Sequence, residues 1–426
     1  MMHRLYHALT VLVGPLLPFY LKRRMARGKE DSQRISERLG QPGRPRPEGK
    51  LVWLHAASVG ESLSLLPLVE RLAARLPAPR PITVLVTTGT VTSAKLMAER
   101  LPTGAIHQFV PVDRPAYVRR FLDHWRPDLV LWAESDFWPN LLAGIAGRNV
   151  PLVLVQGRIS ARSFAGWQRA RGFIRTVLGR FTLCLTQTPG DAERLAALGA
   201  REVRCLGNLK MAVPPLPHQP AELAELQQVI GNRPLWLAAS THAGEEAAAA
   251  RIHQRLAARF PRLLTIIVPR HPHRGPDVAA EVKALGLDAA LRSAGQGPDT
   301  AIYVADTMGE LGLFYRLCPI VFMGKSLSVG GGQNPFEPAL LGAAVLFGPR
   351  MSNFPDMAPV MAAAGAAILV ADEAGLAESI GDLLADPAKL ATRRAAAQAW
   401  AEAEAGALEA VMAALEPFLV TLDARP

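Results

Sequence analysis

Short, almost wholly apolar runs alternate with amphipathic stretches in the first half of the chain, between Leu51 and Leu206. The runs are LVWLH (51–55), ITVLVT (82–87), DLVLWAE (128–134), PLVLVQ (151–156), FTLCLTQ (181–187) and VRCLG (203–207). Strands of a parallel sheet are apolar along their whole length, because helices cover both faces of the sheet. The pattern therefore predicts an α/β unit in which these six runs are parallel strands.

A second series of the same kind follows in the other half of the chain. Its runs are LWLAAS (235–240), LLTIIVP (263–269), AIYVAD (301–306), PIVFMG (319–324) and AAVLFGP (343–349). The stretch 211–220, MAVPPLPHQP, separates the two series, and its prolines favour a stiff linker because they fit inside neither sheet. We expect two Rossmann-like domains facing across a cleft, since open parallel sheets bind ligands beyond the carboxyl ends of their strands.

The pattern divides the chain into five predicted segments. They are an N-terminal membrane anchor with a basic flank (1–27), a first Rossmann-like domain (28–212), the linker (213–220), a second Rossmann-like domain (221–400) and a C-terminal helix expected to return to the first domain (401–426). A chain of 426 residues exceeds what one hydrophobic core usually covers, which agrees with two domains.

The segment from Leu5 to Leu21 carries no formal charge, and a basic cluster, KRRMAR (22–27), follows it directly. It is slightly shorter than the ~20 residues of a comfortable membrane span, and Pro15 and Pro18 would kink it. A spanning anchor and a helix lying in the membrane plane are therefore both open. The basic cluster predicts that the following domain stays in the cytoplasm.

The amino-acid composition indicates which class of partner the chain binds. The formal net charge is +10, which favours an anionic partner such as a phospholipid surface or a phosphorylated substrate. Nucleic acid is disfavoured, because the sequence has no zinc-ligand spacing or RNA-binding aromatic motif and few dense basic runs. The cysteines, Cys184, Cys205 and Cys318, lie in or beside apolar strands and are expected to be buried thiols.

Polar motifs follow the predicted strands of the first domain. After 51–55 come Ser58, Gly60 and Glu61, where Glu61 can accept a proton from a hydroxyl or can simply complement a helix dipole. Thr88 belongs to a hydroxyl-rich turn, TTGTVTS (87–93), that can bind phosphate or cap a helix. Glu134 and Asp136 end another strand beside Trp138, which can stack on a sugar or fill the core.

In the second half, the motifs point to an anion site. Lys210 ends the first domain in GNLK (207–210), and Ser240-Thr241 follows the first strand of the second series. The basic run RHPHR (270–274) suits a phosphate or a carboxylate. Further backbone donors are expected at MGE (308–310), where another helix begins.

The glycine-rich stretch GGGQNPFEPA (330–339) joins a flexible loop to a carboxylate at a predicted helix start. Glycine amides can approach a phosphate closely, and Glu337 can accept hydrogen bonds from a ribose diol. A plain helix N-terminus entered through Asn334-Pro335 is the alternative. No His/Cys/Asp cluster has metal-ligand spacing, so no metal is predicted.

Taken together and in order, eight motifs resemble those of the Kdo (3-deoxy-D-manno-octulosonic acid) transferases of lipopolysaccharide synthesis. They are HAASVGE (55–61), TTGTVTSA (87–94), ESDFWPN (134–140), GNLK (207–210), STHAGEE (240–246), VPRHPHR (268–274), GEL (309–311) and GGGQNPFEPA (330–339). The N-terminal anchor followed by SERLG (36–40) is also similar to that family.

The resemblance implies an inverting GT-B glycosyltransferase that moves Kdo from CMP-Kdo to a lipid A precursor at the inner membrane, with no metal or cofactor. Glu61 would be the catalytic base and Glu134 a supporting acid. The implied donor residues are Ser240, Thr241, Arg270, His271, Pro272, Met308, Gly309, Glu310, Gly331, Gly332, Asn334 and Glu337. Further substrate contacts are expected at Ser58, Gly60, Thr88, Asp136 and Lys210.

The chain departs from the family pattern in four places. Asp136 stands in place of a glutamate, Gln156-Gly157-Arg158 in place of Asn-Ala-Arg, Lys325 in place of a glycine and Gln333 in place of a histidine. Two alternatives remain from the residues themselves. One is a different GT-B nucleotide-sugar transferase or epimerase, and the other is a non-catalytic module that binds anionic lipid.

Overall fold

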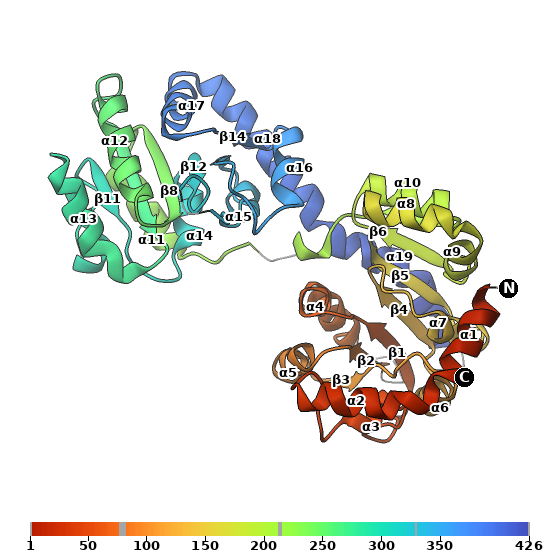
Figure 1. The fold of residues 1–426 in the computed structure, drawn as a ribbon. Coiled ribbons are helices and arrows are strands. Elements are labelled where there is room, and N and C mark those ends of the chain that lie inside the picture. Colours follow the sequence, from red (N-terminus) through yellow and green to blue (C-terminus); the bar gives the residue numbers. More distant parts are fainter. Residues whose placement is uncertain (1, 76–81, 212–214, 329, 425–426) are drawn as a thin grey trace. The chain divides into compact units, whose positions relative to one another are not determined.

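The computed structural model describes residues 2–75, 82–211, 215–328 and 330–424, and the chain forms two compact α/β units. The first unit contains Met1–Ala212 together with Glu404–Pro426, and the second contains Val213–Ala403. Each is built around a seven-stranded sheet (Figure 1). The first two residues of the predicted linker lie outside the described residues, and helix α11 begins at its last residue, Pro220.

The sheet of the first unit has the order β3-β2-β1-β4-β5-β6-β7, and all neighbouring strands are parallel. The strands are β1 (Lys50–His55), β2 (Ile82–Thr88), β3 (Ala105–Phe109), β4 (Leu129–Ala133), β5 (Leu152–Gly157), β6 (Leu183–Thr186) and β7 (Val203–Cys205). All six predicted strands are present. The sequence analysis missed β3, because this edge strand contains His107 and Gln108 and lacks a continuous apolar run.

Helices cover both faces of this sheet, and successive side chains of β1 therefore enter two different cores. Val52 and Leu54 pack with α4, α5 and α19, whereas Leu51 and Trp53 pack with α6, α7, α9 and α10. The helices of this unit, apart from the N-terminal pair, are α3 (Ile35–Arg38), α4 (Val59–Ala73), α5 (Val91–Arg100), α6 (Pro115–Trp125), α7 (Pro139–Ala146), α8 (Ala161–Arg169), α9 (Arg171–Leu178), α10 (Pro189–Leu198) and α19 (Ala407–Ala424).

The second unit repeats the plan, with a parallel sheet in the order β10-β11-β9-β8-β12-β13-β14. Its strands are β8 (Leu235–Thr241), β9 (Leu264–Pro269), β10 (Ala289–Leu291), β11 (Ile302–Val304), β12 (Ile320–Met323), β13 (Ala344–Phe347) and β14 (Ala367–Leu369). The five predicted strands are present. The two that were missed, β10 and β14, are edge strands of three residues.

One core of the second unit lies between the sheet and helices α12, α13 and α17. Its longer helices are α11 (Pro220–Ile230), α12 (Glu245–Ala257), α13 (Gly275–Ala284), α17 (Glu373–Ala385) and α18 (Pro387–Ala405). The shorter helices are α14 (Leu311–Leu317), α15 (Phe336–Leu340) and α16 (Met357–Ala363). Helix α18 continues into α19, which packs in the first unit.

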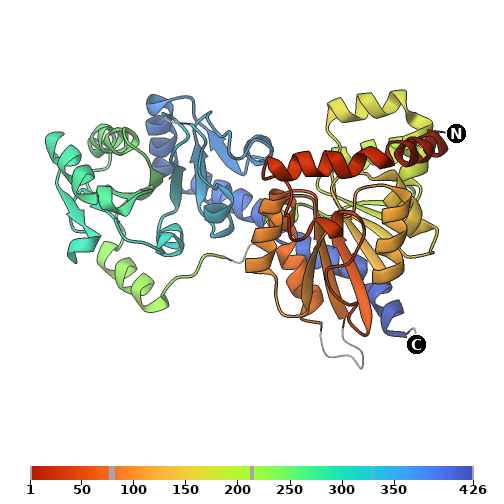
Figure 2. The same ribbon diagram turned by 60° about the horizontal axis from the view of Figure 1, so that its bottom comes forward.

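The N-terminal segment forms two helices, α1 (Met2–Leu12) and α2 (Leu17–Ala26), joined by a short 3-10 turn and bent by 44°. Figure 2 shows both helices lying along the first unit. Tyr6 donates a hydrogen bond to Asp113 (3.0 Å), Asn140 donates one to Thr10 (3.0 Å), and Leu21 is buried. By length and composition, 387–422 and this bent pair both qualify as candidate membrane spans.

The cysteines differ from the prediction at one position. Cys184 and Cys318 are buried, but Cys205 is exposed. The expectation of a buried thiol at Cys205 is wrong because β7 is a three-residue strand at the sheet edge, where its neighbour Arg204 is also exposed.

Candidate functional site

The predicted residues of the first unit gather at the carboxyl ends of the central strands. The strand order reverses at β1, which has β2 on one side and β4 on the other. The loops that follow β1 and β4 leave in opposite directions at such a point and open a crevice between them. Ser58 and Glu61 follow β1, and Glu134 and Asp136 follow β4.

Glu61 is held by two hydrogen bonds at the start of α4. Ser58 Oγ accepts a hydrogen bond from the Glu61 amide (3.3 Å), and Glu61 Oε2 accepts one from the Ala57 amide (2.7 Å). Ser58 thus caps α4, and the Glu61 side chain turns back to the amide of Ala57, the residue before the capping serine. The half-buried carboxylate is thereby oriented, and no described residue donates a hydrogen bond to Oε1. Gly60 is exposed beside it.

The second acid of this unit, Asp136, lies close to Glu61. Burial raises the pKa of Asp136, and the nearby charge of Glu61 raises this pKa further, whereas a hydrogen bond from Trp138 Nε1 (3.1 Å) lowers it. Trp138 itself is partly buried against the core of the first unit. Two carboxyl groups therefore share the site, and burial together with the charge of Glu61 disfavours the ionised form of Asp136.

Glu134 and Lys210 meet in the same unit, although they are far apart in sequence. Lys210 Nζ lies 3.9 Å from Glu134 Oε1. The backbone that carries Lys210 is held by Gln156, whose side chain donates to Gly207 O (3.1 Å) and accepts from the Leu209 amide (3.0 Å). Gln156 was not among the predicted site residues, although it ends an apolar strand and is one of the departures from the family pattern.

Thr88 lies deeper than the prediction required. It is fully buried, and its hydroxyl hydrogen-bonds His107 Nε2 (2.9 Å). Burial lowers the pKa of His107 to about 3, and it does the same for His55, whose Nδ1 hydrogen-bonds Thr87 (2.9 Å). Both imidazoles are therefore neutral near pH 7, and each forms a hydrogen bond with a threonine hydroxyl of β2.

The second unit has its own reversal point between β8 and β12. Ser240 has a left-handed backbone (φ +53°) and is buried with Thr241 at the end of β8. A Cβ at Gly324 would lie 2.5 Å from Ser240 O, so only glycine allows the two strand ends to approach this closely.

Glu245 joins the two loops at this reversal point and was not predicted. Its buried carboxylate accepts from the His242 amide (3.1 Å) on one side. On the other side it accepts from the amides of Lys325 (2.6 Å), Ser326 (3.2 Å) and Leu327 (3.4 Å). The neighbouring Glu246 is also buried and pairs with Arg274 (2.8 Å).

The basic run after β9 supplies exposed basic side chains beside these loops. Arg270 and His271 are exposed, and Pro272 opens a short 3-10 turn. The His271 ring stacks on His273 and meets the edge of His242 (centroids 5.7 and 5.8 Å). These side chains come from two loops of one sheet edge, which is the arrangement that an anionic ligand requires.

The glycine loop differs from the prediction in its hydrogen bonds. Gly331 and Gly332 have φ of +112° and +70°, and their amides already donate to Arg350 O (2.9 Å) and Lys325 O (2.8 Å). The expectation that these amides face a phosphate is therefore wrong. The glycines serve the left-handed path of the loop, and a Cβ at Gly332 would collide with Met351.

The end of that loop keeps one acceptor open. Asn334 Nδ2 donates to Glu337 Oε1 (3.0 Å), and Asn334 Oδ1 accepts from the Phe336 amide at the start of α15 (3.2 Å). Burial raises the pKa of Glu337, and the Asn334 bond lowers it. No described residue hydrogen-bonds Glu337 Oε2, which leaves it able to accept from a ligand hydroxyl.

The segment 308–310 has divided roles. Met308 is 74% exposed, and Gly309 has φ +82° with open space around it. Glu310 makes two hydrogen bonds with Arg292 (2.6 and 2.7 Å) and another with Thr307, and the Arg292 contact lowers the pKa of Glu310. Its carboxylate is thus engaged within the protein.

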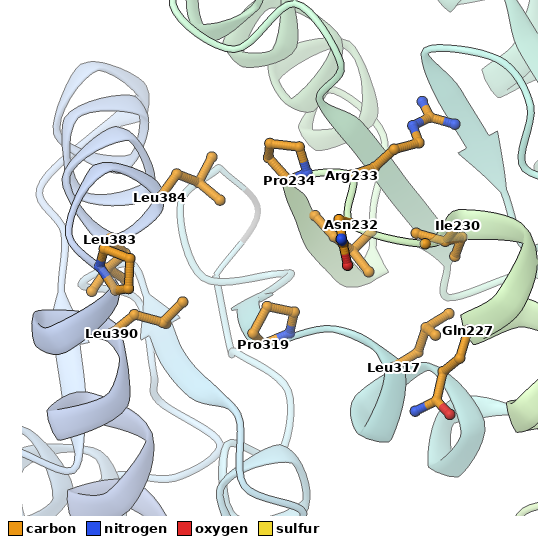
Figure 3. A pocket seen from close by; sticks show the side chains of 13 residues that line it. Gln227, Ile230, Asn232, Arg233, Pro234, Leu317, Pro319, Leu383, Leu384 and Leu390 are labelled. Carbon is orange, nitrogen blue, oxygen red and sulfur yellow. The ribbon is translucent and has the colours of Figure 1, made fainter.

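A separate cavity of about 460 Å³ lies elsewhere in the second unit (Figure 3). It is lined by Pro234, Pro319 and leucines of α17 and α18, at the amino ends of β8 and β12. Because ligands of parallel sheets bind at the opposite edge, and this lining is mostly apolar, we do not assign the cavity a catalytic role. Within the described ranges, no group of three or more His, Cys, Asp or Glu side chains is placed to hold a metal ion.

Comparison with known proteins decides the family. The family model described as 3-deoxy-D-manno-octulosonic-acid transferase (kdotransferase) matches residues 33–213. The 3-deoxy-D-manno-octulosonic acid transferase of Bordetella pertussis is 35% identical over 422 residues, which cover 96% of this chain and 97% of that protein. The chain belongs to the Kdo transferase family. The Kdo transferase of Rickettsia bellii is 34% identical, covering 87% of this chain and 88% of its own.

Two solved structures are also similar. The C-terminal CMP-Kdo binding domain of WaaA from Acinetobacter baumannii is 34% identical and covers 42% of this chain and 94% of that chain, with a TM-score of 0.40. An enzyme assigned as a UDP-N-acetylglucosamine 2-epimerase from Listeria monocytogenes is 16% identical, with a TM-score of 0.50, and covers 88% of this chain and 97% of that chain. The second likeness concerns the fold alone and agrees with the two parallel sheets.

As a Kdo transferase, the chain is a glycosyltransferase, and one of its departures from the family pattern now has a structural role. Gln156 has φ +55° and clamps the segment 207–209 through both atoms of its amide. Gln156 therefore forms a polar clamp at the end of β5.

Proposed function

We propose that this Kdo transferase moves Kdo from CMP-Kdo to a hydroxyl of a lipid A precursor, as a GT-B enzyme of lipopolysaccharide synthesis. The observation that carries the proposal is the oriented carboxylate of Glu61, whose Oε1 accepts no hydrogen bond within the described residues. A hydroxyl must lose its proton as it attacks a sugar carbon, and a fixed carboxylate is a suitable acceptor.

In the proposed reaction, the acceptor oxygen forms a bond to the anomeric carbon of Kdo, and the bond from that carbon to the CMP phosphate oxygen breaks. The proton passes to Glu61, and the electron pair leaves with CMP. A single displacement of this kind inverts the anomeric centre. Glu134, paired with Lys210, and Asp136 would orient the acceptor.

The second unit is the proposed donor side. The leaving phosphate gains charge, which cations can stabilise without a metal. The exposed Arg270 and His271 and the buried Ser240 and Thr241 support this role by their common sheet edge. Glu337 Oε2 would accept from the ribose, and Met308 and Gly309 would border the nucleotide. Because Glu310 forms an ion pair with Arg292, its proposed role is to support the segment 308–310 and not to contact the ligand.

Nucleotide choice tests the proposed donor. We expect CMP to raise the melting temperature of the protein by several degrees at saturating concentration, because a ligand that binds only the folded state stabilises it. UDP and GDP, at the same concentration, are expected to have little effect. A thermal-shift titration with the three nucleotides measures this, and stabilisation by UDP alone would contradict the Kdo assignment.

We also propose that the N-terminal helices bind the anionic inner membrane from its cytoplasmic side. Leu5, Leu12, Leu16 and Phe19 are 65 to 77% exposed, and exposed Lys22, Arg23 and Arg27 follow them. Both helices are tied to the first unit by the Tyr6 and Thr10 hydrogen bonds and by buried Leu21, which favours a position in the membrane plane.

Polar substitution of this surface is expected to release the protein from membranes. Leu12, Leu16 and Phe19 changed to serine should abolish co-sedimentation with anionic vesicles. The wild type should stay bound in salt of about 1 M, where the Debye length is about 3 Å, because salt does not screen the burial of apolar side chains. The matched control changes two exposed apolar residues of the second unit, Val229 and Leu369, to serine. Sedimentation of the triple variant would mean that another surface binds.

A further inference from the structure

Lys325 occupies a backbone position that is unfavourable for its residue type. It follows β12 and has φ +59°, in the left-handed region. A side chain with a Cβ is strained there, by roughly 1–2 kcal/mol relative to the right-handed conformation. Strain of this kind persists where the surroundings enforce it, and it concentrates at functional sites.

The surroundings do enforce it. The Lys325 amide donates to buried Glu245 (2.6 Å), and the Lys325 carbonyl accepts from the Gly332 amide (2.8 Å). The preceding residue, Gly324, is pressed against Ser240 O. The backbone of Lys325 is therefore fixed at the reversal point between β8 and β12.

The strain at Lys325 is part of a pattern. Of the six non-glycine residues with positive φ in the described ranges, Glu134, Gln156, Ser240 and Lys325 lie at carboxyl ends of central strands. Glu134 follows β4 in the first sheet, and Lys325 follows β12 in the second. Each of these strands lies next to the first strand of its sheet, β1 or β8, across the reversal point.

The side chain of Lys325 has no anionic partner within the part of the chain that the structure describes. It is half-buried, and its Cε lies against Gly331, where an added Cβ would come within 3.3 Å. Its charge is felt by His242, whose pKa is lowered by burial and then by Lys325. The carboxylate of Glu245 nearby is already occupied by four backbone amides.

We infer that Lys325 is a donor-binding residue of this chain, whose ammonium group contacts an anionic oxygen of the sugar nucleotide. This rests on the proposed function. CMP-Kdo carries two such groups, the phosphate and the carboxylate of the sugar acid, and an ammonium group forms charge-assisted hydrogen bonds with either. The glycine-rich loop that Lys325 Cε contacts at Gly331 also contains Gln333, whose side chain lies 3.4 Å from His242 Nε2.

Two substitutions separate ligand binding from folding. Lys325→Met removes the charge and keeps the side-chain length, whereas Lys325→Gly also removes the backbone strain. Glycine relieves the left-handed backbone strain, so Lys325→Gly should raise the melting temperature of the second unit by about 1 to 3 °C. The same substitution should weaken ligand binding, because the ammonium group is lost. The matched control is Arg126→Gly, another exposed basic residue with positive φ (+41°), in the first unit.

Calorimetric titration with CMP and cytidine, and the KM for CMP-Kdo, give the readout. We expect both Lys325 variants to weaken CMP about tenfold or more, with cytidine affinity unchanged, if the phosphate is the partner. A KM for CMP-Kdo raised about tenfold with CMP affinity unchanged would instead identify the sugar carboxylate. The control variant Arg126→Gly should change neither the affinity for CMP nor the KM for CMP-Kdo.

The outcomes also separate this inference from the proposed function. If the wild type binds CMP and all affinities and KM values of the Lys325 variants equal those of the wild type, the inference is overturned and the proposed donor stands. If the wild type does not bind CMP, the proposed donor fails, and the inference fails with it.

Discussion

Replacing Glu61 with glutamine is expected to lower kcat by about 10² to 10⁴-fold and to leave the Kd for CMP unchanged. A positioned general base contributes roughly this much to a rate, and its loss does not affect donor binding when the base acts on the acceptor. Steady-state kinetics with CMP-Kdo and a tetraacylated lipid A precursor, together with CMP titration, measure both quantities.

The capping geometry makes this substitution a sharp test. Glu61 Oε2 accepts a hydrogen bond from the Ala57 amide, and a glutamine carbonyl oxygen can accept the same bond. If Glu61 only capped α4, Glu61→Gln would be almost silent in both stability and activity.

The control for charge removal is Glu409→Gln, an exposed acid in the first turn of α19 that pairs with Arg71 (2.9 Å). It should keep wild-type kcat. Full activity of Glu61→Gln would refute Glu61 as the general base and would mean that another group accepts the proton of the acceptor hydroxyl.

The strands and the place of the site could be predicted because they depend on local pattern and on topology. Apolar runs such as LVWLH and LWLAAS identify strands covered on both faces, and the residues that follow them must lie at one edge of a parallel sheet. Glu61, Glu134 and Ser240 were placed in this way. The edge strands β3 and β10 were missed because β3 contains the polar His107 and Gln108 and β10 has only three residues. The edge strand β14 lies in a short apolar run, AAILV (366–370), for which no strand was predicted.

The hydrogen-bond partners within each site could not be predicted, because they depend on residues far apart in sequence. The amides of Gly331 and Gly332 are used by Arg350 and Lys325, and the carboxylate of Glu310 is used by Arg292. No local pattern contains these pairs. The motif STHAGEE marks the loop after β8, but nothing in it distinguishes buried Glu245 as the residue that holds the loop after β12.

The largest expected loss of stability follows from Glu245. Glu245→Ala leaves four backbone amides, those of His242, Lys325, Ser326 and Leu327, without their common acceptor. Because a buried donor without a partner costs about 1–3 kcal/mol, and water can reach some of these amides, we expect the second unit to lose roughly 3–5 kcal/mol. Denaturant unfolding, followed by probes specific to this unit, measures the loss.

Hydrogen exchange locates the effect. The amides of 325–327 should exchange much faster in Glu245→Ala than in the wild type, because Glu245 is their acceptor, and CMP affinity should fall with them since Lys325 is displaced. Glu373→Ala is the matched control, because Glu373 also lies in the first turn of a helix in this unit but bonds exposed Arg251 (2.6 and 2.9 Å). An exposed pair of this kind contributes at most about 1 kcal/mol. If the two variants lose the same free energy of unfolding, the loop after β12 is held by its own contacts. The buried carboxylate of Glu245 would then not be what fixes Lys325.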